Sequence, residues 1–384
     1  MKKTVAVIFG GRSAEHDVSI ITAYIPIITS LKASGQYEVV PVYITTEGAW
    51  YSDPAMTSLD FFKRPNYLEQ LTRRKQLQFS FDGGLNLIWP GLRVKSQKID
   101  IVFPAMHGTY GEDGTLAGLL RLANVPYVGC DLESSAIAMD KVLTKMATEP
   151  LGIPSTPYTW FTSLDWQTDA SAIKERIAKL SFPLFVKPVH LGSTIAITRV
   201  AGPADLENAI ELALHYDDKV IVEQGVANLI EVTLPIIGND ELELAQVEQP
   251  LAEFFDFEEK YLKGGKKGAG GVNAQYSNIP AKISLELMRR VQELGKATYR
   301  AIGASGIARV DFLIDAQAGI VYMNEVNTLP GSLYIHNWKQ SGKSGITLVT
   351  RLIELAEQRH QESQRTSFAF HSDILNKVNG GKFQ

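Results

Sequence analysis

A hairpin of two apolar strands carries polar groups that could perform chemistry. Residues 309–315 and 320–327 are apolar and β-branched, which predicts two antiparallel strands joined by a short glycine-containing turn. One cation and three oxygen-bearing groups interrupt these strands, namely Arg309, Asp311, Glu325 and Asn327. Burying such groups without partners would be strongly unfavourable. The pattern therefore predicts that something binds between them.

Strand alternation predicts that the oxygen-bearing groups share one face. Glu325 and Asn327 are two residues apart, so their side chains point the same way. With the turn centred midway between the strands, Asp311 is expected opposite Met323 and diagonal to Glu325, roughly 7 to 8 Å away between side-chain bases. Oxygen ligands at that reach suit Mg²⁺ or Mn²⁺ bound together with substrate phosphates. An ordinary ion-pair network with Arg309 and a nearby lysine is the alternative.

Composition and charge exclude several classes of protein. The chain has 384 residues, 45% hydrophobic and 21% charged, as in a globular protein of two or three domains. Its net charge is −4, and apart from a cluster at 263–267 its basic residues are too scattered to build a nucleic-acid-binding face. The single cysteine, Cys130, excludes an intrachain disulfide and favours a reducing compartment. The N-terminal apolar run is too short to cross a bilayer, so we expect a cytoplasmic protein without a membrane partner.

The N-terminus predicts a strand, a glycine turn and a helix. Residues 4–9 are continuously apolar, as in a buried parallel strand. Two glycines follow, and Ser13 is expected to be the N-cap of a helix that begins at Ala14. A strand, a glycine turn and a helix N-terminus together form an anion pocket. Glu15 lies in the first turn, where an acidic residue could also simply complement the helix dipole.

The rest of the chain alternates predicted strands and helices. Pro26 is expected to kink or end the first helix, and residues 50–98 predict an irregular segment with a short hairpin at 82–84. A glycine-rich polar loop at 106–115 follows a strand, at the edge where open α/β sheets bind ligands, and a first α/β unit ends near residue 130. Further strands are predicted at 38–45, 99–104, 127–129, 182–188, 195–200, 219–224 and 231–237, and further helices at 116–123, 134–146, 205–214, 284–303 and 346–358.

Two small-residue segments predict phosphate binding and a lid. Lys187 ends a predicted strand, and the loop 190–194 follows it without the spacing of a P-loop. A lysine there holds phosphate by its charge while backbone N–H groups surround the oxygens; an exposed hairpin tip is the alternative. The segment 254–271 is aromatic, then charged, then rich in glycine. That order predicts a mobile lid or, as the alternative, a solvated linker.

Seven motifs occur in a fixed order along the chain. They are GGRSAEHDVS at 10–19, HGTYGEDG at 107–114, MDK at 139–141, VKP at 186–188 with GST at 192–194, FFDFEEKY at 254–261, ARVDF at 308–312 and NEVNTLPG at 324–331. In content and order, from residue 4 to about 360, the chain resembles the D-alanine:D-alanine ligases of the ATP-grasp superfamily. Seven motifs in register are far more specific than any one of them, and they favour the metal interpretation of the hairpin.

The resemblance implies an α/β protein with the α+β ATP-grasp fold. An N-terminal parallel-sheet domain would be followed by two mixed α+β subdomains that enclose ATP. The implied divisions are 1–130 for the N-terminal substrate-binding domain, 131–226 and 227–360 for the two subdomains, 254–278 for the lid, 309–327 for the metal hairpin and 361–384 for a tail without assigned chemistry.

The resemblance also implies an ATP-dependent ligase that forms D-alanyl-D-alanine for peptidoglycan synthesis. A carboxylate is a poor electrophile, so the first D-alanine would become an acyl phosphate, and the amine of the second would then displace phosphate. The implied site residues are Glu15, Ser193, Tyr261 and Arg309 in catalysis; Lys141, Lys187, Glu223, Gln224, Val226, Glu231 and Lys260 toward ATP; Asp311, Glu325 and Asn327 as ligands of two Mg²⁺ or Mn²⁺ ions; and His107 and Gly331 toward the substrate.

Roles within that implied site follow from the same resemblance. Arg309 would stabilise the oxyanion that develops at the attacked carbonyl. Glu15 would hold the ammonium of the first substrate and, with Ser193 and Tyr261, link the N-terminal helix to the lid. The three lysines would hold phosphates, while Glu223 and Glu231 would meet the adenine and the ribose. A homodimer is expected.

Three departures from the family pattern leave the second substrate open. Segment 332–339 is shorter than, and different from, the segment that binds the second substrate's carboxylate. Ala196 stands where a glycine is usual, and 227–230 lacks the glycine-containing approach to Glu231, which predicts local changes in the nucleotide pocket. The alternatives are a related ligase that uses D-lactate, D-serine or another amino acid, and a nucleotide-binding homologue without turnover.

Overall fold

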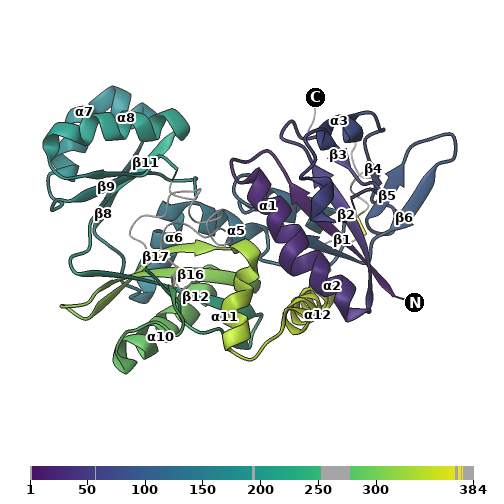
Figure 1. The fold of residues 1–384 in the computed structure, drawn as a ribbon. Coiled ribbons are helices and arrows are strands. Elements are labelled where there is room, and N and C mark those ends of the chain that lie inside the picture. Colours follow the sequence, from purple (N-terminus) through teal and green to yellow (C-terminus); the bar gives the residue numbers. More distant parts are fainter. Residues whose placement is uncertain are drawn as a thin grey trace.

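The structure is a computed structural model that describes residues 2–56, 58–192, 195–251, 277–367, 371–372 and 374. Three four-stranded sheets organise these residues, with helices on their faces (Figure 1). The architecture is mixed α/β. Among the described residues, no helix combines the length and the hydropathy needed to cross a membrane.

The first sheet lies in the N-terminal part of the chain and is mainly parallel. Its strands, in the order β3-β2-β1-β7, are β3 (Trp50–Tyr51), β2 (Tyr37–Ile44), β1 (Lys3–Gly10) and β7 (Ile101–Pro104). Only β3 pairs antiparallel. Every residue of β1 after Lys3 is buried, as expected for a strand covered on both faces.

The helix after β1 continues through its proline. The helical run comprises α1 (His16–Thr22), a π-helical segment (Ala23–Ile28) and α2 (Thr29–Ser34). Pro26 lies in the π-helical segment, whose wider turn accommodates a residue without an N–H. The predicted start at Ala14 and cap at Ser13 are wrong. The helix begins at His16 with Glu15 at the N-cap position, and the Ser13 hydroxyl accepts a hydrogen bond from the Glu15 N–H (3.0 Å) within the turn before it.

Residues 50–98 hold more regular structure than predicted. They contain α3 (Tyr67–Thr72) and an antiparallel meander of β4 (Gln78–Ser80), β5 (Asn86–Trp89) and β6 (Lys95–Lys98). The predicted hairpin at 82–84 joins β4 to β5, and β6 extends it. After α4 (Thr115–Leu122), the predicted strand at 127–129 is reduced to one parallel bridge between Tyr127 and Val102.

The predicted helix at 134–146 is two helices, α5 (Leu132–Met139) and α6 (Lys141–Thr148). The break lies at Asp140, whose backbone is extended (φ −87°, ψ 106°). The Asp140 carboxylate accepts hydrogen bonds from the N–H groups of Val142 (2.8 Å) and Leu143 (2.9 Å), so it is the N-cap of α6. Lys141 is therefore the first residue of a helix instead of one in its middle.

The second sheet is antiparallel and is built from the middle part of the sequence. In the order β10-β9-β11-β8, its strands are β10 (Thr198–Val200), β9 (Leu184–Pro188), β11 (Lys219–Gln224) and β8 (Tyr158–Thr162). The predicted strand at 195–200 is thus shorter at its start. Two helices, α7 (Ser163–Ile177) and α8 (Leu206–Tyr216), pack their apolar sides against this sheet.

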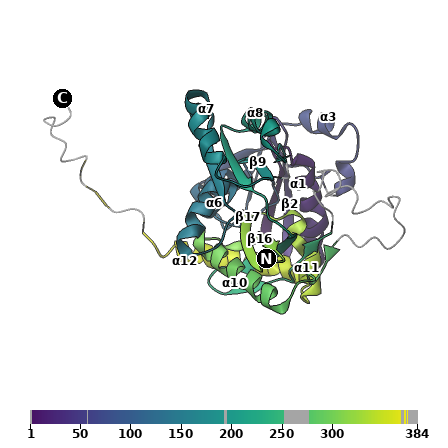
Figure 2. The ribbon, with the colours of Figure 1, turned by 90° about the vertical axis from the view of Figure 1, so that its left-hand side faces the viewer.

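The third sheet contains the polar hairpin. Its order is β13-β12-β16-β17, with β13 (Leu242–Leu244), β12 (Leu229–Gly238), β16 (Gly306–Asp315) and β17 (Ile320–Asn327); β14 (Gln249–Pro250) and β15 (Ser277–Asn278) pair nearby. Helix α10 (Leu285–Ala301) covers one face, where it packs with Val310, Phe312 and Ile314. Arg309 and Asp311 alternate with these residues, so they face away from α10. Figure 2 shows α7 and α10 at opposite ends, with β16 and β17 between them.

The last helices return to the N-terminal sheet. After α11 (Ile335–Gln340), α12 (Gly345–Ser363) packs beside α2 (Figure 1). Leu348, Leu352 and Ile353 of α12 share one hydrophobic core with residues of β1 and α2. The chain's C-terminal helix thus fixes the N-terminal sheet against the third sheet.

Candidate active site

A bulge brings the polar groups of the hairpin closer together than predicted. Asp311 lies opposite Glu325, and Arg309 lies opposite Asn327. Beyond Asp311 the register shifts, so that Phe312 pairs with Met323. The predicted pairing of Asp311 with Met323 is therefore wrong, because a β-bulge places one extra residue in β17. All four polar side chains extend from the same face of the two strands.

Arg309 and Asp311 form a buried ion pair on that face. The Arg309 Nε donates to Asp311 Oδ1 at 2.6 Å, and its Nη2 donates to Oδ2. Asn327 donates a further hydrogen bond to Asp311 Oδ2 at 3.2 Å. Burial acts to lower the pKa of Arg309, but the charge and hydrogen bonds of Asp311 outweigh it and raise that pKa well above its usual range. Arg309 is therefore a fixed cation in the site.

The donor set of this face fits a hard divalent cation. Asp311, Glu325 and Asn327 offer carboxylate and amide oxygens, the ligands that Mg²⁺ and Mn²⁺ take in proteins. The ion-pair alternative is present at the same time, since Arg309 pairs with Asp311. The two interpretations are compatible, because a carboxylate has two oxygens and several lone pairs.

One pocket collects predicted residues from three parts of the chain. It is lined by the predicted residues Glu15, His107, Lys141, Arg309, Glu325, Asn327 and Gly331, among others. The N-terminal part supplies Glu15 and His107, the start of α6 supplies Lys141, and the hairpin with the segment that follows it supplies the others. Residues that the sequence separates by more than 300 positions therefore meet at one cavity.

Three of the residues predicted to meet ATP lie on the neighbouring strands β9 and β11. Lys187 on β9 pairs with Glu223 on β11. Burial acts to lower the pKa of Lys187, but the charge of Glu223 outweighs it and raises that pKa. The side chain of Gln224 accepts a hydrogen bond from the Ser181 N–H at 3.0 Å. Val226 follows β11, and Glu231 is exposed near the start of β12.

Lys141 is held against the loop that follows β9. Its Nζ donates to the backbone oxygen of Leu191 at 2.6 Å and to that of Val189 at 3.4 Å. Burial lowers the pKa of Lys141. These two hydrogen bonds position the Lys141 ammonium group against the loop.

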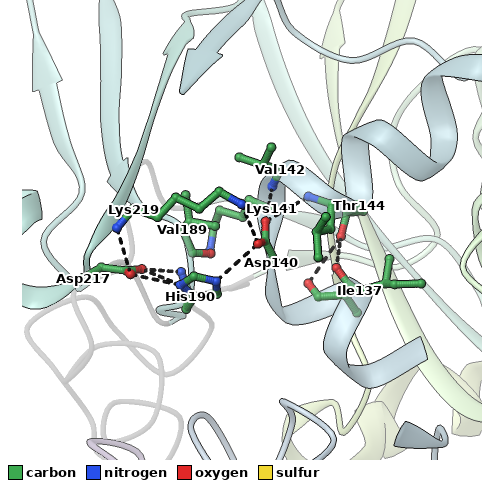
Figure 3. Close-up of polar contacts among 11 residues, drawn as sticks. Ile137, Asp140, Lys141, Val142, Thr144, Val189, His190, Asp217 and Lys219 are labelled. Carbon is green, nitrogen blue, oxygen red and sulfur yellow. Dashed lines mark hydrogen bonds and ion pairs between the residues drawn. The ribbon is translucent and has the colours of Figure 1, made fainter. Parts of the chain in front are cut away.

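His190, in the loop after β9, contacts Asp140, the N-cap residue of α6 (Figure 3). Its Nδ1 lies 2.9 Å from Asp217 Oδ1, and its Nε2 lies 3.3 Å from Asp140 Oδ2. Lys219 also donates to Asp140 Oδ2 at 2.7 Å. Hydrogen bonds to Asp140 and Asp217 raise the pKa of His190 to about 9, so the ring is an imidazolium at neutral pH.

The comparisons with known proteins decide the family. Residues 4–130 match the model of the D-ala D-ala ligase N-terminus, and residues 147–354 match that of the D-ala D-ala ligase C-terminus. The chain belongs to the D-Ala-D-Ala ligase family. It is 38% identical to the D-alanine–D-alanine ligase of Thermoanaerobacter sp. (strain X514) over 376 residues, which cover 95% of this chain and 99% of that protein.

Solved structures of a D-Ala-D-Ala ligase and of a D-Ala:D-Ser ligase share the fold. The D-alanine-D-alanine ligase from Coxiella burnetii superposes with a TM-score of 0.79 at 29% identity, covering 95% of this chain and 96% of that one. The VanG D-Ala:D-Ser ligase from Enterococcus faecalis gives 0.75 at 32% identity, covering 93% and 100%. The fold class predicted from the sequence is confirmed.

Part of the site predicted from the family pattern lies outside the described residues. This applies to Ser193, Lys260 and Tyr261, and to nearly all of the lid assigned to 254–278. Their roles stay predictions.

Sequence reasoning missed Glu112, which lines the pocket together with Glu15 and Glu325. Its carboxylate accepts hydrogen bonds from the N–H groups of Gly108 (2.8 Å) and Leu329 (3.3 Å). Burial and then the negative charge of Glu15 raise the pKa of Glu112 to about 8. Its place in the HGTYGEDG motif was the available signal, but nothing in the sequence indicated that it would face Glu15.

The segment after the hairpin has an unusual backbone in this D-Ala-D-Ala ligase family member. Ser332, Leu333 and Tyr334 have φ values of 51°, 52° and 50°, a left-handed turn that costs non-glycine residues energy. The Ser332 N–H donates to Thr22 Oγ1 at 3.1 Å, and the Tyr334 ring lies 4.9 Å from the Arg309 guanidinium carbon. Burial raises the pKa of Tyr334 to about 12. This turn covers Arg309; its choice of the second substrate stays a prediction.

Proposed function

We propose that this chain is an ATP-dependent ligase that joins two D-alanine molecules into D-alanyl-D-alanine for peptidoglycan synthesis. The observation that carries the proposal is the shared pocket, where Glu15 and His107 of the N-terminal part face Arg309 and Glu325 of the hairpin. A carboxyl-activating reaction needs cations for phosphate, an acid to hold an amine and a donor for an oxyanion. This pocket offers all three.

Each chemical step has a candidate residue. The carboxylate of the first D-alanine attacks the γ-phosphorus of ATP, ADP leaves, and Lys141 and Lys187 bind the phosphates by charge. The amine of the second D-alanine then attacks the acyl phosphate carbon, loses a proton and displaces inorganic phosphate. Arg309 stabilises the negative charge that develops on the attacked carbonyl oxygen. Glu15 holds the ammonium group of the first substrate.

The divalent cation belongs to the same proposal. Asp311, Glu325 and Asn327 would hold Mg²⁺ or Mn²⁺, which neutralises phosphate charge when bound.

The proposal also includes a homodimeric assembly and a cytoplasmic location for the protein. Sedimentation of the purified protein tests the dimer, and a sedimentation coefficient of a monomer at micromolar concentration contradicts it.

Product analysis tests the proposed reaction. With ATP, Mg²⁺ and D-alanine, we expect release of inorganic phosphate and a product with the mass of D-alanyl-D-alanine. Absence of phosphate release contradicts the proposal. A parallel panel with D-serine and D-lactate as second substrates resolves the acceptor, because the segment after Gly331 departs from the family pattern and one related structure is of a D-Ala:D-Ser ligase.

Replacing one proposed metal ligand tests the hairpin. Glu325→Gln removes a charge while it keeps the shape of the side chain, so we expect phosphate release to fall at least 100-fold with an unchanged circular dichroism spectrum. Glu286→Gln, at an exposed position in the first turn of α10, is the matched control and should keep full activity. An active Glu325→Gln variant would show that the hairpin does not bind the metal.

A further inference from the structure

A buried triad of charges lies beside the pocket. Each oxygen of the Glu223 carboxylate faces a different lysine: Oε1 lies 2.7 Å from Lys145 Nζ, and Oε2 pairs with Lys187. The exposed fractions of the three side chains are 0% for Lys145, 4% for Glu223 and 11% for Lys187. Water therefore screens these charges little, and the triad carries one net positive charge.

Lys145 is held firmly in this triad. It lies one helical turn after Lys141 on α6. Its ammonium group also donates to the Thr156 hydroxyl at 3.4 Å and lies 5.1 Å from the centre of the Tyr158 ring. Lys145 is not one of the described residues that line the pocket. Its direct link toward Lys187 is the ion pair with Glu223.

The charge of Glu223 decides how strongly Lys187 is held. Burial acts to raise the pKa of Glu223, but the charges of Lys145 and then Lys187 outweigh it and lower that pKa. Glu223 is thus a carboxylate shared by two cations. If a phosphate draws Lys187 away, Lys145 still compensates Glu223, and no buried charge is left without a partner. Without Lys145, Glu223 would hold Lys187 in a neutral pair and oppose that movement.

We propose that Lys145 is a positioning residue that shares Glu223 and thereby makes the charge of Lys187 available to the phosphates of ATP. The proposal rests on the proposed function, in which Lys187 binds phosphate. In this proposal the Glu223 carboxylate is also the counter-ion of Lys145 and Lys187, in addition to its predicted contact with the nucleotide.

A double-variant cycle tests the proposal through binding of ATP with Mg²⁺, measured by calorimetry. Lys145→Met leaves a neutral Glu223–Lys187 pair, so we expect the Kd for ATP to rise at least tenfold, with the KM for D-alanine changed less than twofold. Adding Glu223→Gln removes the competing carboxylate and restores one net positive charge at Lys187. Because Glu223 itself is predicted to contact the nucleotide, the double variant is compared with Glu223→Gln alone, and we expect the Kd values of these two variants for ATP to agree within threefold.

Two further measurements keep the test decisive. Lys179→Met, an exposed lysine after α7, should leave the Kd for ATP unchanged. Lys145→Met keeps the Glu223–Lys187 ion pair, so it leaves no buried charge without a partner and should fold; the comparison of Glu223→Gln with the double variant does not depend on it. A double variant that binds ATP more than tenfold weaker than Glu223→Gln alone overturns the proposal, and so does a folded Lys145→Met variant that binds ATP as tightly as the unchanged protein. Product formation by the unchanged protein tests the proposed function separately.

Discussion

At the scale of single residues, Glu112 shows how burial and the charge of Glu15 disfavour a further negative charge in the pocket. Its pKa is raised to about 8, whereas an unperturbed glutamate ionises near pH 4.5. Between these values the unfolded chain releases a proton that the folded site keeps. The folded state therefore loses stability as pH rises through this window, because a folded-state carboxyl pKa above the unfolded value favours the protonated form.

Glu112→Gln should remove this loss. We expect the variant to be about 1 to 3 kcal/mol more stable than the unchanged protein at pH 8 and nearly equal to it at pH 4, by urea denaturation without ligands. Glu133 offers a control of opposite sign, because a hydrogen bond from exposed Arg121 lowers its pKa. Glu133→Gln should be neutral or slightly destabilising at pH 8. Equal stability of the Glu112→Gln variant at both pH values would contradict the expectation.

At the scale of elements, the loop after β9 depends on a histidine that joins it to α6. His190 faces the carboxylates of Asp217 and Asp140, with Lys219 on the same Asp140 oxygen (Figure 3). The histidine's pKa is raised to about 9 from 6.5. The stability that this pair contributes is thus fully present below pH 6.5 and is lost as pH rises through 9.

His190→Ala should therefore destabilise the protein in a pH-dependent way. The side chain is 42% exposed, so screening limits the effect at pH 7 to about 1 kcal/mol. We expect the difference to shrink between pH 8 and pH 10 in denaturant titrations. His215→Ala, at an exposed position on α8, is the control and should show no such trend. A constant difference across this range would indicate that only packing was lost.

The elements show what the sequence could predict and why. Local patterns were sufficient for the buried strand before Gly10, the central strands, α10 and α12, because hydrophobic periodicity reports burial directly. The break at Asp140 was missed, although an Asp directly before Lys141 in the MDK motif is a fair N-cap signal. The pattern of apolar residues continued across it, and periodicity alone indicated one helix.

Non-local features explain the remaining differences. A bulge changed the pairing of Asp311, and strand alternation cannot reveal an extra residue in one strand. The charge triad also could not be predicted from the sequence. Lys145 and Glu223 are 78 positions apart, and a lysine in a helix is usually interpreted as a solvent-exposed residue. The types of the hairpin residues were nonetheless informative, since four polar groups in apolar strands marked the site before any fold was known.

At the scale of the whole molecule, one arginine links the N-terminal sheet, the third sheet and the last helix. Arg359 of α12 donates to the backbone oxygens of Gly129 (2.5 Å) and Tyr127 (2.8 Å) and to the Ser305 hydroxyl (2.6 Å). Its guanidinium carbon also lies 4.5 Å from the centre of the Tyr127 ring. Through these contacts Arg359 holds Tyr127 and Gly129 beside Ser305, which directly precedes β16, the strand that carries Arg309.

Arg359→Met should weaken this junction. The change leaves two carbonyl groups and a hydroxyl without their donor, so we expect the free energy of unfolding to fall by about 2 to 4 kcal/mol, measured by urea denaturation. Because Glu15 and Arg309 reach the pocket from the two parts that Arg359 joins, the KM for D-alanine should rise as well. Arg365→Met, beyond the end of the same helix and exposed, should change the unfolding free energy by less than about 0.5 kcal/mol. If both variants lose stability equally, the junction does not depend on Arg359; if only stability changes, the junction supports the fold without setting the distance between the two halves of the pocket.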